Sequence, residues 1–174
     1  IKYLNQSELS FQQRKTKDFL YYPFDPTRTE NSTPLPANKY YDYTQYVISY
    51  RSPSRNLFNT RSNISYGSFY NGTKFSIQNN LSFRKQPIFN VSLRLNYDSI
   101  KLPDPYPSRD IWLITPKFEF TFTKKTFWTT YIQFSSQSEN LGINSRLQWR
   151  FAPLSDLYLV YNDNYFTKNS ITPQ

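Results

Sequence analysis

Residues 72–99 alternate apolar and polar side chains over two consecutive segments that are joined by the short sequence Lys85-Gln86-Pro87. The alternating apolar residues are Phe75, Ile77, Leu81 and Phe83 in the first segment and Phe89, Val91, Leu93, Leu95 and Tyr97 in the second. Most of the positions between them carry polar side chains. A period of two sustained over this length predicts the two strands of a β-hairpin, with one apolar and one polar face.

Aromatic rings stand at both ends of the apolar face in each segment. Phe75 and Phe83 enclose aliphatic side chains in the first segment, and Phe89 and Tyr97 do so in the second. A strand of about 12 residues tilted by about 40° climbs roughly 30 Å, enough to cross the apolar core of a bilayer. Because amphipathic rings settle at the two membrane interfaces, the pattern predicts the wall of a transmembrane β-barrel.

The rest of the chain shows further segments of similar length with no helical periodicity between them. We expect strands at about 8–14, 41–52, 58–71, 73–85, 88–99, 110–124, 126–138, 140–151 and 156–166, and the sequence leaves open whether the aromatic cluster 19–22 continues the first strand or starts another. Consecutive hairpins without crossovers predict an all-β, antiparallel up-and-down meander, either a β-barrel domain spanning residues 1–174 or part of a larger barrel.

Two details of this meander are specific expectations. Asn71-Gly72 is a two-residue sequence typical of the primed hairpin turns, so we expect it to form the turn of its hairpin. Pro116 lies in mid-strand and cannot donate a ladder hydrogen bond, so we expect a bulge or a local edge there. The long connections at about 25–40 and 101–109 are placed outside the cell, because outer-membrane barrels keep their short turns on the periplasmic side.

The composition limits the chemistry that the chain can perform. It contains no cysteine, histidine or methionine among its 174 residues, so the usual zinc, iron and copper sites and thiol or imidazole catalysis are excluded. The sequence also lacks a nucleophile elbow, a phosphate-binding loop and a convincing pair of carboxylates. We therefore expect neither an enzyme nor a cofactor. No export signal precedes Ile1, so we expect a mature or internal fragment.

The two faces of the strands supply the candidate functional residues. The membrane-interface aromatic girdle is predicted to comprise Phe75, Phe83, Phe89, Tyr97, Trp112, Trp128, Trp149 and Phe151. The lumen-facing basic residues are predicted to be Lys74, Arg84, Arg94, Arg146 and Arg150. These charges either make the lumen favourable for anions or brace the wall by pairing with acidic residues such as Asp98 and Glu119, and bracing is the more common case. The net charge of +9 also fits nucleic acid, but the rings fall on the face opposite the basic residues, so no nucleic-acid partner is expected.

Several short motifs resemble a known family. Gly67-Ser68-Phe69-Tyr70-Asn71-Gly72-Thr73, Tyr131-Ile132-Gln133-Phe134 and the run from Asn140 to Asn162 resemble the C-terminal region of uncharacterised Bacteroidota outer-membrane proteins. In that family a barrel-like region follows a module similar to family-nine carbohydrate-binding modules. The present chain lacks that module, and it ends at Ile171-Thr172-Pro173-Gln174 where the family has a final strand ending in an aromatic residue. Nine strands are expected, whereas bacterial single-chain barrels have an even number, so the resemblance and this count together imply part of a larger, porin-like barrel.

Two functional hypotheses follow from these observations. In the first, the chain is an outer-membrane β-barrel protein of a Gram-negative cell that serves transport or anchors a surface or periplasmic module, as a subunit of an envelope complex. Its partners are then the lipid bilayer, lipopolysaccharide and other outer-membrane or periplasmic subunits. In the second, it is a soluble β-sandwich that binds glycans through exposed aromatic residues such as Tyr40, Tyr41 and Tyr106. The barrel of the first hypothesis needs detergent to stay in solution, whereas the sandwich of the second does not.

Overall fold

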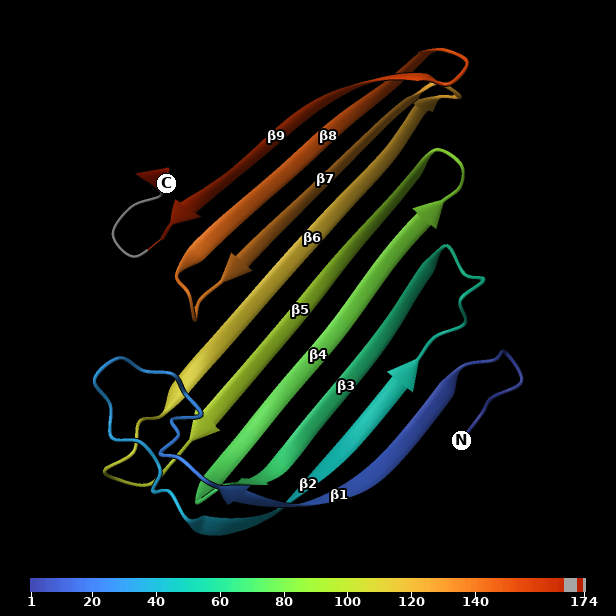
Figure 1. Ribbon diagram of the computed structural model, residues 1–174. Helices are drawn as coiled ribbons and strands as arrows, with labels where there is room; N and C mark the ends of the chain where they lie inside the picture. The colour runs from blue at the N-terminus through green and yellow to red at the C-terminus, as the bar shows by residue number, and fades with distance from the viewer. Residues whose placement is uncertain (168–171, 174) are drawn as a thin grey trace.

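The computed structural model describes residues 1–167 and 172–173. Nine long strands lie side by side in chain order within one sheet, and each pairs antiparallel with its neighbours (Figure 1). They are β1 Glu8–Leu20, β2 Lys39–Arg51, β3 Phe58–Phe69, β4 Gly72–Lys85, β5 Phe89–Lys101, β6 Arg109–Thr123, β7 Thr126–Ser135, β8 Asn140–Ala152 and β9 Ser155–Phe166. A two-residue strand, β10 Thr172–Pro173, pairs with the end of β9. The predicted all-β, up-and-down meander is confirmed.

The strands are long, and the period-two alternation runs unbroken from Phe89 to Tyr97 in β5, whereas in β1 Gln13, Lys15 and Lys17 lie on the face that carries Leu9 and Phe11. The nine long strands range from 10 residues in β7 to 15 residues in β6, about twice the usual length in globular proteins. Residues 8–20 form one continuous strand, which answers the question that the sequence left open. The described residues contain no helix that is long and apolar enough to span a membrane.

The connections alternate between the two ends of the sheet. We call one the long-loop end, because it carries the connections at 21–38, 70–71, 102–108 and 136–139. The other is the short-turn end, with connections at 52–57, 86–88, 124–125 and 153–154. Figure 1 shows the 21–38 loop and the β5–β6 connection together at one end of the sheet. The two longest expected loops therefore lie on the same side.

The sheet has one apolar and one polar face, as the alternation predicts. Cross-strand partners share a face, and the register pairs Leu81 with Leu93 and Leu93 with Pro116. One residue along, it pairs Ser82 with Ser92 and Ser92 with Lys117 on the opposite face. We call these the apolar face and the polar face.

Neither face is covered by a second layer within the described part of the chain. Among residues 1–167, the buried hydrophobic residues are Leu35, Tyr41, Ile100 and Leu102, and all of them lie at the long-loop end. The described residues thus form a single sheet and not the two packed sheets of a sandwich. Tyr41, one of the rings that the glycan-binding hypothesis needs at the surface, is 5% exposed and packs against Tyr70 with ring centroids 5.3 Å apart.

The expected turn at Asn71-Gly72 is wrong by one residue. Gly72 pairs with Phe69 as the first residue of β4, so Tyr70 and Asn71 form the two-residue turn. Tyr70 adopts the left-handed backbone region, with φ 51°. Gly72 is needed for close approach instead, because a Cβ atom there would lie 2.1 Å from the carbonyl oxygen of Lys101.

Of the bulge or local edge expected at Pro116, the bulge is wrong and the local edge is present, because the β6–β7 ladder has no pair at Thr115 or Pro116. Pro116 pairs with Leu93 of β5, and the β6–β7 register is the same on either side of it, with Ile114 opposite Phe134 and Lys117 opposite Tyr131. The register shift lies later in the strand, between Thr121 and Thr123. A proline that lacks one ladder donor is accommodated here because both flanking strands are already aligned by their other residues.

Candidate functional site

Two rows of aromatic rings cross the apolar face. We call them the long-loop row, which contains Tyr66, Phe75, Tyr97 and Trp112, and the short-turn row, which contains Phe58, Phe83, Phe89 and Phe120. On each of β3, β4, β5 and β6 one ring of each row is present, and eight residues separate the two. Eight residues span about 26 Å along a strand and about 20 Å in height at a tilt of about 40°, close to the apolar band of a membrane barrel.

All eight predicted girdle residues lie in or next to these rows. Neighbouring rings touch within each row: Phe83 and Phe89 at 5.4 Å, Phe89 and Phe120 at 6.1 Å, Phe120 and Trp128 at 5.4 Å, Phe75 and Tyr97 at 6.3 Å, Tyr97 and Trp112 at 4.3 Å, between centroids. Trp149 and Phe151 continue the short-turn row on β8, with centroids 5.9 Å apart. The band between the rows is aliphatic on β5, with Val91, Leu93 and Leu95, whereas β3 and β4 also place Thr60, Ser62 and Asn79 in it.

The two rows follow the hydrogen-bond ladder from β3 to β4 and from β5 to β6, and they step together relative to it between β4 and β5. Between β4 and β5 the ladder joins Phe83 to Val91 and Phe75 to Ser99. The rings on β5 are instead Phe89 and Tyr97, so each row steps two residues towards the short-turn end. The separation of eight residues is kept across this one step, as expected where tilted strands cross two parallel planes.

All five predicted basic residues lie on the polar face, and four of them have a protein partner. Lys74 pairs with Asp98 at 3.0 Å, Arg150 pairs with Asp156 at 3.1 Å, Arg84 donates to the Ser54 carbonyl at 3.0 Å, and the Arg146 guanidinium lies 5.7 Å from the Tyr158 ring centre. Glu119 pairs with Lys117 and accepts a hydrogen bond from Asn90. These contacts brace the polar face. Arg94 makes no ion pair among the described residues.

Arg51 and Arg61 join Arg94 in one row across the polar face, and the sequence analysis missed both. The ladders place Arg51 opposite Arg61, Arg61 opposite Asn80, and Asn80 opposite Arg94. We call Arg51, Arg61 and Arg94 the arginine row. The alternation of β3 alone could have assigned Arg61 to the polar face, but the neighbourhood of Arg51 depends on the register.

The 21–38 loop packs on the polar face at the long-loop end. Leu35 and Thr27 of this loop are 1% and 0% exposed. The loop residue Phe24 contacts Tyr70, which in turn contacts Tyr41 and Tyr43 of β2. The loop therefore folds inwards over the polar face instead of extending away from the sheet.

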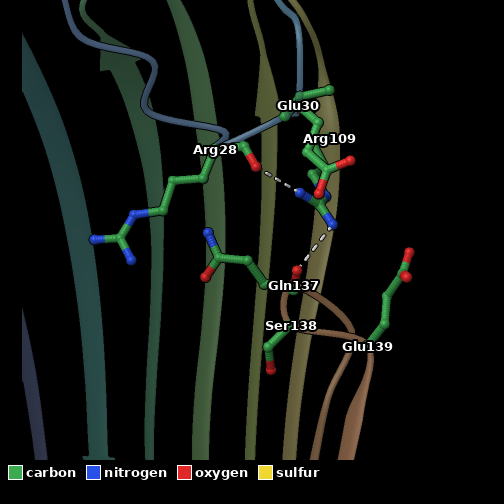
Figure 2. A pocket seen from close by; sticks show the side chains of 7 residues that line it. Arg28, Glu30, Arg109, Gln137, Ser138 and Glu139 are labelled. Atoms are coloured by element: carbon green, nitrogen blue, oxygen red, sulfur yellow. Dashed lines mark hydrogen bonds between the residues drawn. The ribbon is translucent and has the colours of Figure 1, made fainter. Parts of the chain in front are cut away.

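Arg109, the first residue of β6, holds this loop against a second connection (Figure 2). Its guanidinium donates to the carbonyl oxygens of Thr27 and Arg28 at 3.4 and 3.0 Å, and to those of Ser136 and Gln137 at 3.3 Å each. A hollow of about 340 Å³ lies beside this contact. One cation thus joins the β1–β2 loop to the β7–β8 connection.

We expect Arg109→Ala to loosen the 21–38 loop. Hydrogen bonds from a charged group contribute about 1.5 to 3 kcal/mol in favourable cases, so losing this set should make loop opening at least about tenfold more frequent. The readout is the rate of trypsin cleavage after Arg28, which is exposed, in detergent-solubilised protein. Arg55→Ala, in a connection at the opposite end, is the matched control and should leave the rate unchanged. An unchanged rate in Arg109→Ala would contradict the assigned role.

Asp25 organises the interior of the same loop. Its carboxylate accepts hydrogen bonds from the backbone N–H groups of Thr27 and Thr29, both at 2.8 Å, and from the hydroxyls of Thr27 and Ser32, both at 2.7 Å. Burial acts to raise the pKa of Asp25, but these hydrogen bonds outweigh it and hold the pKa below its usual value.

This depressed pKa predicts an acid-sensitive loop. The stabilisation is complete at pH values above the unfolded-state pKa of about 3.9 and is lost as the pH falls through the lower folded-state pKa. Hydrogen exchange of residues 25–32 should therefore accelerate, relative to the intrinsic rate, between pH 4 and the still lower folded-state pKa. Asp25→Asn should remove this pH dependence; a variant that keeps it would show that another group is responsible.

The chain was also compared with known proteins. No protein-family model, curated protein or solved structure matches it, so the resemblance to the Bacteroidota family stays a prediction.

Proposed function

We propose that this chain forms part of the wall of a β-barrel in a Gram-negative outer membrane, and that the barrel serves the transport of small solutes. The observation that carries the proposal is the pair of aromatic rows at constant separation on an apolar face that nothing in the described chain covers. Lipid is the solvent that accepts such a face, and amphipathic rings at two heights match its two interfaces.

The sheet edges support closure with further strands. Along most of their length, β1 and β9 each have a strand partner on one side only within the described residues. Backbone groups at membrane depth must be hydrogen-bonded, so open edges do not persist in a bilayer. In this proposal the missing partners are strands of the same or another subunit, which makes the chain a component of an envelope assembly.

The polar face favours transport over simple anchoring. An anchor needs only its lipid-facing surface, whereas this face carries exposed arginines, at positions 61 and 94, between the heights of the two aromatic rows. Charges at this depth require water. In this proposal water fills the lumen of the barrel between the two aromatic rows, so small solutes can pass through it. The 21–38 loop folds into this lumen from the long-loop end.

The test is fractionation of cells expressing the native protein, followed by gel electrophoresis with and without boiling. We expect the protein in the outer-membrane fraction, migrating as a compact form that boiling converts to a slower one. Recovery in the soluble fraction without detergent would contradict the proposal and would assign the aromatic rows to a protein interface.

A further inference from the structure

We infer that the arginine row is a binding site for small oxyanions, such as a carboxylate or an inorganic phosphate, on the inner surface of the barrel. The inference rests on the proposed function for its setting, since a lumen exists only if the barrel does. The site itself is a property of β2 to β5 and can be tested separately.

The geometry brings two guanidinium groups to either side of one hollow. Arg61 and Arg94 flank Asn80 on adjacent strands, so their Cα atoms lie about 10 Å apart. Asn63, Gln78 and Asn96 are partners in the next polar-face row. These residues line a hollow of about 270 Å³. Two forked cations with amide groups beside them suit an anion that also carries hydroxyl or carbonyl groups.

Arg61 and Arg94 make no ion pair within the described chain, whereas Arg51 has Glu8 as its cross-strand partner on β1, and Glu8, Arg51 and Arg61 line a neighbouring hollow. Arg51 and Arg61 are direct cross-strand partners, an arrangement of like charges that destabilises a sheet. The nearest acidic groups on the central strands are engaged elsewhere, Asp98 with Lys74 and Glu119 with Lys117. The other cationic residues that the sequence placed on this face contact a carboxylate, a carbonyl or a ring. A bound anion would offset the repulsion that remains.

The height of the arginine row in the barrel wall also bears on ion selectivity. Arg61 lies three residues from Phe58 and five from Tyr66 on β3, and Arg94 lies three residues from Tyr97 and five from Phe89 on β5. The row therefore stands between the two interfaces, where the low-dielectric wall limits screening of its charge. Rings of arginine and lysine at such positions select anions in pores.

Calorimetric titration of the detergent-solubilised native protein with inorganic phosphate at low ionic strength tests the site. We expect the wild type to bind and Arg61→Ser/Arg94→Ser to bind at least tenfold more weakly, since two charged donors are lost. Lys124→Ser, which removes one exposed charge from the β6–β7 turn, should bind like the wild type. The same titration with acetate determines whether carboxylates share the site.

A charge-conserving variant separates binding from folding. Arg61→Lys/Arg94→Lys keeps the charge but loses the planar fork, so phosphate should bind more weakly than to wild type and more tightly than to the double serine variant. Phosphate binding is compared only among variants that migrate as the compact form on a gel without boiling, which shows that they are folded. Absence of phosphate binding in the wild type, or equal binding in the folded double serine variant, would overturn the inference.

Conductance across planar bilayers separates this inference from the proposed function. A salt gradient should give a reversal potential of the anion-selective sign, reduced in Arg61→Ser/Arg94→Ser and kept in Arg61→Lys/Arg94→Lys. Phosphate binding without conductance would uphold the site and contradict transport. Conductance with unchanged selectivity and no arginine-dependent phosphate binding would uphold transport and overturn the site.

Discussion

Leu93→Arg is expected to lower the free energy of unfolding in lipid by about 2 to 4 kcal/mol, the cost of an arginine at the midplane of a barrel wall. Leu93 lies four residues from each of Phe89 and Tyr97, at the centre of the band between the aromatic rows, and pairs with Leu81 and Pro116. An arginine here has to be desolvated or deform the bilayer. Denaturant-induced unfolding of the native protein in lipid vesicles measures the change.

Ser92→Arg is the matched control, because it adds the same side chain one residue away. Ser92 pairs with Ser82 and Lys117 on the polar face, so its replacement should cost less than about 1 kcal/mol next to water. If Leu93→Arg were neutral and Ser92→Arg disruptive, lipid would lie against the polar face and the assignment of the two faces would be reversed.

Gly67→Ala is expected to destabilise the sheet by about 1 to 3 kcal/mol, the usual cost of inserting an atom into a packed site. A Cβ atom at Gly67 would lie 2.1 Å from the Thr44 carbonyl oxygen and 2.7 Å from the Gln45 Cα atom. Both are backbone atoms, so β2 must move away from β3. The adjacent contact would suffer too, because the Ser68 hydroxyl accepts from the Thr44 N–H at 2.7 Å and donates to its carbonyl at 3.2 Å.

Gly142→Ala provides the comparison for this prediction. The nearest atom to a Cβ there is the side-chain oxygen of Asn164, at 2.9 Å, which can rotate away on the exposed strand β9. Gly142→Ala should therefore lower the free energy of unfolding by less than about 0.5 kcal/mol in the same experiment. Equal effects of the two substitutions would show that the close approach of β2 and β3 does not limit stability.

The strands were predictable from sequence because their signal is local. The segments expected at 73–85 and 88–99 became Gly72–Lys85 and Phe89–Lys101, since a period of two leaves little freedom in where a strand begins. The placement of the eight predicted aromatic residues on one face followed from the same alternation. The turn predicted at Asn71-Gly72 was wrong because glycine is favoured both in tight turns and where two backbones approach closely. Here Gly72 is required by its close approach to Lys101 and lies in β4.

The arginine row and the inward-folded loop depend on distances along the chain that alternation does not encode. Arg51 meets Arg61 only through the β2–β3 register. Arg109 reaches the carbonyl of Arg28, 81 residues away, because the 21–38 loop returns over the polar face. The sequence predicted the interrupted ladder at Pro116 but not the absence of a bulge, because the pairs on both sides of the proline hold β6 in register.

The most direct test of the lipid-facing wall is a spin-label scan of β5 in the native protein reconstituted into lipid vesicles. Residues 1–174 contain no cysteine, so single variants from Phe89→Cys to Tyr97→Cys each place one nitroxide in this part of the protein. If β5 belongs to a lipid-facing wall, collisions of the nitroxide with oxygen should peak at positions 91, 93 and 95. Collisions of the nitroxide with a water-soluble nickel chelate should peak at positions 90, 92, 94 and 96. Nickel access at 91, 93 and 95 equal to or above that at the even positions would contradict the account.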